Sequence, residues 1–169
     1  MAVLVGKLGV EDLDGFVEEL GAIGERHGVT IQAFDARYVA GRRHLDRAVT
    51  LADRAIERGE NVAHDRAVEI LLYAAGRRQI DRALEMGVSP GETDAVVLVD
   101  GPGDEQRAVE ALEREFGDLE CVPANESLST GDADTLAAFF GVTDEERNVT
   151  DASLEALVCE RVALLDVEK

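Results

Sequence analysis

Three arginines in the middle of the sequence are the residues whose type and spacing suggest chemistry. Arg78 and Arg82 are four positions apart, so on a helix they share one side, and Arg77 lies beside them. Guanidinium groups bind anions such as phosphate through paired hydrogen bonds. We therefore expect a positively charged surface that binds something anionic.

Two consecutive helices within residues 63–87 must position these arginines. Residues 67–75 are apolar on most sides, which indicates a buried helix. After Gly76, a second turn and helix begins at Arg77. Four residues of this second helix recur at helical spacing and are expected to face the core: Ile80, Ala83, Leu84 and Gly87. Gly87 is also expected to end the helix.

Charge is distributed unevenly along the sequence. The formal net charge is −19, from 17 basic and 36 acidic residues. Residues 26–82 nevertheless hold eleven arginines against eight acids, whereas residues 83–169 hold five basic residues against 22 acids. One interpretation is that the arginines only pair with acids on the same helix, as Arg77 could with Asp81. The other is that a basic face binds an anionic ligand.

Length and composition indicate a single domain, residues 1–169, that is long enough to bury a core. No run of about 18 apolar residues is present, so we expect no membrane-spanning helix. The first residues lack the pattern of a signal peptide, and Cys121 and Cys159 form no C-x-x-C pair. We therefore expect a cytoplasmic protein without disulfides or a zinc site.

The choice of charged residues indicates a source rich in salt. The chain contains 15 arginines, two lysines and a large excess of acid. Halophiles use such acidic surfaces for solubility, because salt screens the self-repulsion. We therefore expect the chain to come from a salt-loving archaeon.

Apolar segments and their spacing predict about four strands and about six helices. The strands are expected at residues 2–8, 29–35, 95–99 and 119–122. Besides those of residues 63–87, helices are expected at 11–27, 42–58, 104–116, 132–140 and 150–166, the last capped by Thr150 or Asp151. The expected fold class is α/β (or α+β), with a small mixed or antiparallel sheet.

Patterns typical of catalysis or metal binding are weak. The three histidines, at positions 27, 44 and 64, match no metal-ligand spacing, and neither cysteine has a neighbouring histidine. Gly101-Pro102-Gly103 follows a strand and opens a helix, but acids follow where a dinucleotide would place its pyrophosphate. We interpret this segment as a plain turn. An enzyme acting on a small molecule has no other support, and we expect no catalytic residues, no cofactor and no metal.

Four stretches of the sequence carry a resemblance to a known family. They are residues 31–36 (IQAFDA), 69–80 (EILLYAAGRRQI), 139–146 (FFGVTDEE) and 160–167 (ERVALLDV). In this order and spacing they resemble the small PRPK-binding-protein family, a subunit of the KEOPS complex of archaea and eukaryotes. The resemblance covers nearly the whole chain.

The resemblance implies a mixed α/β fold and a non-catalytic regulatory subunit. The complex makes N6-threonylcarbamoyladenosine in tRNAs that decode codons starting with A, and a separate subunit carries the catalysis. The subunit resembled here binds the kinase-like ATPase of the complex and helps to recruit tRNA by holding its single-stranded 3′ CCA end. The alternative is a protein-interaction scaffold of the kinase-like subunit that binds no RNA directly.

The resemblance also implies which residues bind RNA. The residues expected near the CCA end are Arg77, Arg78, Gln79, Ile80 and Arg82, where arginine suits phosphate and glutamine suits a base edge. Tyr73 could stack on a base and Glu69 could orient an arginine, although a tyrosine in so apolar a helix is more often a core residue.

The last helix is the expected kinase contact. Its four candidate residues are Leu157, Val158, Arg161 and Leu165. The leucines could equally be core residues, because one amphipathic stripe looks the same in either role.

Overall fold

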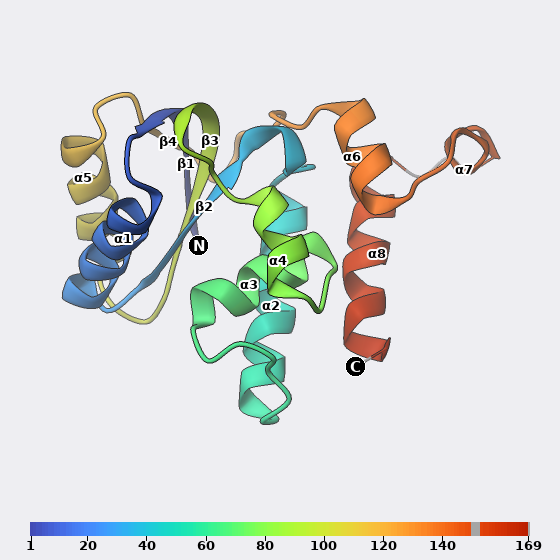
Figure 1. Cartoon of the computed structure of the whole chain (residues 1–169), viewed down its shortest axis with the longest axis horizontal. Coiled ribbons are helices and arrows are strands. Elements are labelled where there is room, and N and C mark those ends of the chain that lie inside the picture. The colour runs from blue at the N-terminus through green and yellow to red at the C-terminus, as the bar shows by residue number, and fades with distance from the viewer. Residues whose placement is uncertain (150–152, 169) are drawn as a thin grey trace. The chain divides into compact units, whose positions relative to one another are not determined.

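The computed structural model of the chain describes residues 1–149 and 153–168, shown in Figure 1. The elements in order are β1 (Ala2–Val10), α1 (Leu13–His27), β2 (Thr30–Asp35), the 3-10 turn η1 (Ala36–Tyr38), α2 (Arg42–Glu57), α3 (Arg66–Ala75), α4 (Ile80–Ala83), the 3-10 turn η2 (Leu84–Met86), β3 (Gly91–Asp100), α5 (Glu105–Glu115), β4 (Glu120–Val122), α6 (Ala133–Phe140), α7 (Asp144–Val149) and α8 (Leu154–Glu168). The α/β fold class is confirmed, and the four strands lie within a few residues of where the sequence predicts them.

The described residues form eight α-helices, of which α7 lies where the sequence analysis expects none. The signal for α7 is present in the sequence as a capping box. The Thr143 hydroxyl accepts a hydrogen bond from the Glu146 N–H at 3.1 Å, and the Glu146 carboxylate accepts one from the Thr143 N–H at 3.5 Å. The expected cap of the last helix, Thr150 or Asp151, lies outside the described residues. Ser153 accepts a hydrogen bond from the Ala156 N–H at 3.2 Å at the start of α8.

Contacts divide the chain into two compact units. Unit 1 comprises residues 1–36 and 87–126 and contains the sheet with α1 and α5. Unit 2 comprises residues 37–86 and 127–169 and contains the other helices. Each unit is built from two separate segments, so no linker composition marks a boundary along the sequence.

The sheet of unit 1 has the strand order β2-β3-β1-β4, and every neighbouring pair is antiparallel. Residues 95–99 of β3, the most apolar strand, are all buried. Helices α1 and α5 lie on the same side of the sheet (Figure 1) and pack against it through one hydrophobic cluster. Phe16 of α1 meets Phe116 edge-on, with ring centres 5.5 Å apart. This core positions no side chain of the candidate site, which lies in unit 2.

The Gly101–Gly103 turn packs backbone against backbone at the end of α1. The Gly103 N–H donates to the Gly28 carbonyl at 3.0 Å, and the Asp104 N–H donates to the His27 carbonyl at 2.8 Å. A Cβ atom on Gly103 would collide with these backbone atoms. The glycine is therefore required by close packing, as expected for a plain turn.

Unit 2 is helical, and α3 and α8 both pack against α2. His44 of α2 is completely buried and accepts a hydrogen bond at Nδ1 from the Ala40 N–H at 3.1 Å. This assigns the proton to Nε2, which donates to the Ala74 carbonyl of α3 at 2.8 Å. The His44 ring therefore ties the start of α2 to the last turn of α3. No helix in the described residues is long and apolar enough to cross a membrane.

Candidate functional site

Helix α3 is the buried support of the arginines. Its N-terminus is capped by the Asp65 carboxylate, which accepts a backbone N–H at 2.7 Å, and residues 69–75 are all buried. Gly76 ends the helix in the left-handed conformation, with φ of 61°. The Arg77 N–H closes the turn on the Leu72 carbonyl at 3.0 Å. The chain then continues on the surface as residues 77–85, here called the arginine segment.

Glu69 and Tyr73 are core residues with no exposed surface. Both carboxylate oxygens of Glu69 lie 3.0 Å from the Val62 N–H, which donates to them. The Tyr73 hydroxyl donates to Asp166 at 3.3 Å, and burial raises the pKa of Tyr73, as do the nearby carboxylates. The expectation that Tyr73 stacks on a base is therefore corrected, because its ring has no exposed surface. The expectation that Glu69 orients an arginine stays a prediction. Both side chains belong to a helix that is buried on nearly all sides.

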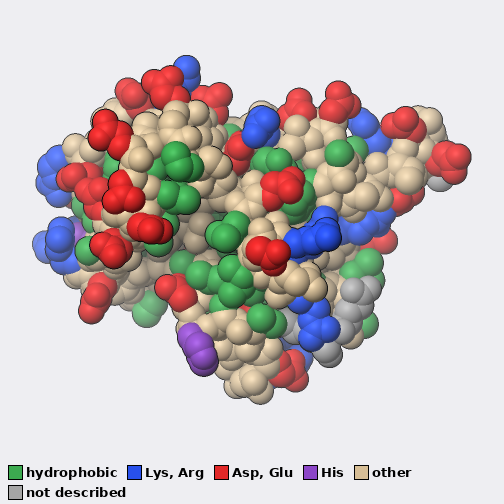
Figure 2. Space-filling model, in the orientation of Figure 1, with side chains coloured by type: hydrophobic (Ala, Val, Ile, Leu, Met, Phe, Trp, Pro, Cys, Tyr) green, Lys and Arg blue, Asp and Glu red, His purple; other side chains and the backbone are tan. Residues whose placement is uncertain are grey.

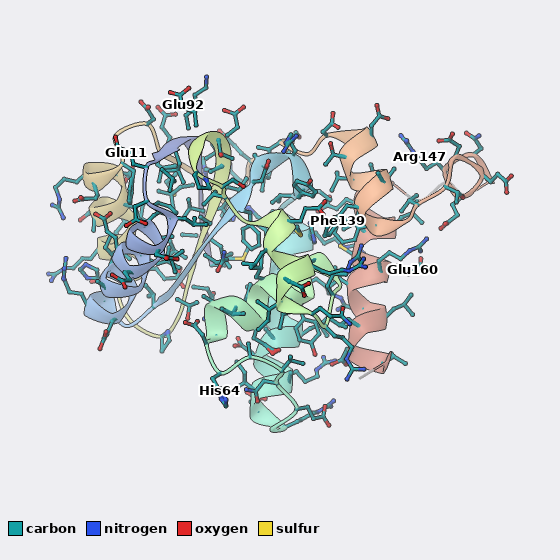
Figure 3. The ribbon with its side chains drawn as sticks, in the orientation of Figure 1. Glu11, His64, Glu92, Phe139, Arg147 and Glu160 are labelled. Atoms are coloured by element: carbon teal, nitrogen blue, oxygen red, sulfur yellow. The ribbon has the colours of Figure 1, made fainter. Side chains whose placement is uncertain are left out.

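Arg77 is held against an aromatic ring. Its guanidinium carbon lies 4.6 Å from the centre of the Phe139 ring in α6, and its Nη2 donates to the Phe139 carbonyl. Phe139, labelled in Figure 3, meets Tyr38 edge-on with ring centres 5.2 Å apart. A cation–π contact fixes the position of the guanidinium and preserves its charge. Arg77 is thus a positioned, half-buried cation.

The remaining residues of the arginine segment are mostly exposed. Arg78, Gln79 and Arg82 lie on the surface, as the sequence predicts. Ile80 and Leu84 were expected to face the core, but they are 43% and 57% exposed. The predicted apolar stripe does not form, because α4 has only four residues and continues as the tighter 3-10 turn η2, which changes the side-chain spacing. An exposed isoleucine thus lies beside cations and an amide.

A hollow of about 350 Å³ adjoins the arginine segment. Its lining combines cations, carboxylates and an aromatic ring, from Arg77, Asp81, Arg82, Glu85, Ala138 and Phe139. Four of these were not predicted as site residues from the sequence: Asp81, Glu85, Ala138 and Phe139. Acids are too common in this chain for their spacing to carry information, and Phe139 is 62 positions from Arg77.

Basic residues are concentrated in unit 2. This unit contains 13 of the 17 lysines and arginines against 18 acids, whereas unit 1 contains four against 18. In Figure 2, Lys and Arg side chains gather over the region of α4 and α8, while acids dominate the surface around α1. The arginine segment is therefore part of a local basic surface on an acidic protein. In the described part of the chain, no group of His, Cys, Asp and Glu is arranged to hold a metal ion.

Three of the four candidate kinase contacts in α8 point into unit 2. Leu157, Val158 and Leu165 are at most 6% exposed. The fourth, Arg161, donates to both carboxylate oxygens of Glu146 in α7 at 2.7 Å. These bonds hold the pKa of Glu146 below its usual range. The expectation that the three apolar residues contact a partner is corrected, because they are core residues of this unit.

A comparison with family models matches residues 10–166 to the kinase binding protein CGI-121. The chain belongs to the CGI-121 family. A comparison with curated proteins found no match. The family establishes a kinase-binding role. A kinase is therefore the expected protein partner of this chain.

In this CGI-121 protein, α8 also has an exposed face. Glu160, Leu164 and Val167 follow one another at spacings of four and three, so they share one side of the helix. All three are exposed, Leu164 by 42% and Val167 by 80%. Leu164 and Val167 therefore place two exposed apolar side chains on this face of α8. The periodicity of the sequence does not reveal this face, because α8 carries apolar residues on both of its sides.

Proposed function

We propose that this protein is the non-catalytic regulatory subunit of a KEOPS complex, acting in the cytoplasm in the formation of N6-threonylcarbamoyladenosine in tRNA. In this role it binds the kinase-like ATPase subunit through the outward face of α8. It recruits tRNA by holding the single-stranded 3′ CCA end on the arginine segment. Membership of a kinase-binding family supports the first contact.

The arginine segment carries the RNA half of the proposal. Arg78 and Arg82 offer guanidinium groups to phosphates, Gln79 offers an amide to a base edge, and Ile80 offers an apolar surface. The buried helix α3 and the Phe139 ring fix the start of this segment. Single-stranded RNA exposes both its phosphates and its base edges, so it matches this mixture better than duplex RNA does.

The decisive experiment measures the affinity of the isolated protein for tRNA with and without its 3′ CCA end, at several KCl concentrations. We expect removal of the CCA end to weaken binding clearly. Arg78→Glu should weaken binding of intact tRNA by about tenfold or more, because it replaces a phosphate partner with a like charge. Neutral Arg78→Gln should lower the salt slope by about 0.7, the contribution of one phosphate on a single strand.

A matched control uses Arg147→Glu, which makes the same charge change at an exposed position of α7. It should leave tRNA affinity nearly unchanged, and both variants should retain kinase binding. Equal loss in both variants would indicate a diffuse electrostatic effect instead of a site.

The alternative function is a kinase-binding scaffold without RNA contact, and local pairing of other arginines favours it. Arg66 donates to the two Asp53 carboxylate oxygens at 2.7 and 2.9 Å, and Arg54 lies 3.8 Å from Asp166. Equal affinity for tRNA with and without the CCA end, or no binding of either, would favour this alternative.

A further inference from the structure

We propose that Asp81 and Glu85 recognise the free 2′,3′-cis-diol of the last ribose of an RNA. This inference rests on the proposed RNA binding and deepens it, since it assigns a specificity role to two acids within a basic surface. The two carboxylates admit an end with free hydroxyls and exclude an end that carries a phosphate.

The position of the two acids points to a shared ligand. Asp81 and Glu85 are four positions apart, along α4 and η2, and both line the hollow that Arg77 and Phe139 also line. At about 350 Å³ the hollow lies at the lower end of small-ligand sites, which span roughly 300–1,000 Å³. It therefore suits one nucleoside better than a longer stretch of chain.

Glu85 is held in place by a hydrogen bond. The Tyr38 hydroxyl donates to Glu85 Oε2 at 3.1 Å, and the Tyr38 ring packs against Phe139. Glu85 is thus tied to the same aromatic ring that carries the Arg77 guanidinium. An ionised carboxylate has about four acceptor sites, so Glu85 retains capacity for further hydroxyl donors.

The charges around the hollow restrict which groups of a ligand the two acids can bind. Two carboxylates in a site for a polyanion weaken binding unless they contact neutral donors. Within residues 1–149 and 153–168, neither Asp81 nor Glu85 forms a direct ion pair with Arg77 or Arg82, so no such contact occupies their carboxylates. The donors that an RNA end offers are its vicinal hydroxyls, and acidic side chains bind ribose hydroxyls in the same way in dinucleotide sites.

The test compares full tRNA ending in a free diol with the same tRNA ending in a 3′-phosphate or a 3′-O-methyl group. We expect the wild-type protein to bind the diol end about tenfold or more tightly than the phosphate end, because a terminal phosphate would face two carboxylates. The methylated end should also bind more weakly. In the double variant Asp81→Asn, Glu85→Gln, the preference over phosphate should shrink to about threefold or less.

The matched control is Glu145→Gln, at an exposed position of α7, which should retain the wild-type preference. Equal binding of all three ends by the wild-type protein would overturn the inference while leaving CCA binding intact. Failure to bind any tRNA would instead contradict the proposed function. Adenosine monophosphate carries the same diol, so binding of this nucleotide as tight as that of tRNA would assign the hollow to a free nucleotide and overturn the RNA end as its ligand.

Discussion

At the scale of single residues, His44 shows how a titratable group is used for structure. The ring has no exposed surface and uses both nitrogens, one toward Ala40 and one toward Ala74. Burial lowers the pKa of His44 to about 4, because the charged form would lose its solvation. The bond to Ala74 lies two residues before Gly76, so His44 also supports the turn that starts the arginine segment.

We predict that His44 makes unfolding depend on pH. The unfolded chain binds a proton near pH 6.5 and the folded one only near pH 4, so stability should fall as pH drops through this window. The loss attributable to this group is on the order of 3 kcal/mol. Urea unfolding at about pH 7 and pH 5 should show about 2 kcal/mol of this loss in the wild-type protein and none of it in His44→Gln.

The control for this prediction is His64→Gln, because His64 is exposed. Its pH dependence should match that of the wild-type protein. All three proteins contain the same carboxylates, so the difference between variants isolates His44. Identical pH dependence in the wild-type protein and His44→Gln would contradict the assignment.

At the scale of elements, α8 has two apolar faces with different roles. Leu157, Val158 and Leu165 complete the core of unit 2, whereas Leu164 and Val167 face outward. Arg161 joins α8 to α7 through Glu146 and to the end of α6 through the Gly141 carbonyl at 3.4 Å. The outward face is thus presented by a helix that other elements hold in place.

Substitutions on the two faces of α8 should separate folding from kinase binding. Leu164→Glu should weaken binding to the kinase by about tenfold or more, because it places a charge in an apolar contact. Its unfolding midpoint should stay close to that of the wild-type protein, since Leu164 is exposed. Leu165→Ala should instead lose about 2–5 kcal/mol of stability, as buried leucines do.

The measurements are kinase affinity by calorimetry and unfolding by urea, on the same preparations. Unchanged kinase affinity in Leu164→Glu would show that the kinase contacts another surface. A large fall in the stability of Leu164→Glu would show that this residue belongs to the core.

At the scale of the whole molecule, the net charge makes the stability of the fold depend on salt. The net charge of −19 on 169 residues creates self-repulsion that salt screens within a Debye length of about 10 Å at 0.1 M and 3 Å at 1 M. The two units differ, because unit 1 has four basic residues against 18 acids and unit 2 has 13 against 18. Unit 1 therefore has fewer opposite charges to offset the repulsion.

We predict that KCl stabilises the protein and that unit 1 responds more strongly. The urea midpoint should rise between about 0.1 and 2 M KCl, because the folded chain concentrates the acids. Hydrogen exchange should show greater protection gained by the amides of β1 and β3 than by those of α2 and α3. Sucrose at matched osmolality serves as the control, since it does not screen charge. An equal response to sucrose and KCl would contradict an electrostatic cause.

Local patterns in the sequence determined the strands, the long helices and the arginine-rich surface segment. Strand alternation and helical spacing need only neighbouring residues, and β3 and α2 lie within a few residues of their expected bounds. The resemblance of four stretches also led to the family that the comparison established.

Only the tertiary structure decided which sides of these elements are buried. The strand order depends on pairings between distant segments. Tyr73 and Leu157 are enclosed and Ile80 and Leu164 exposed because other helices cover particular faces, which periodicity along one helix does not reveal. The hollow beside the arginine segment could not be predicted from the sequence for the same reason. It forms through contacts between residues far apart in the chain, such as Arg77 with Phe139 and Tyr38 with Glu85.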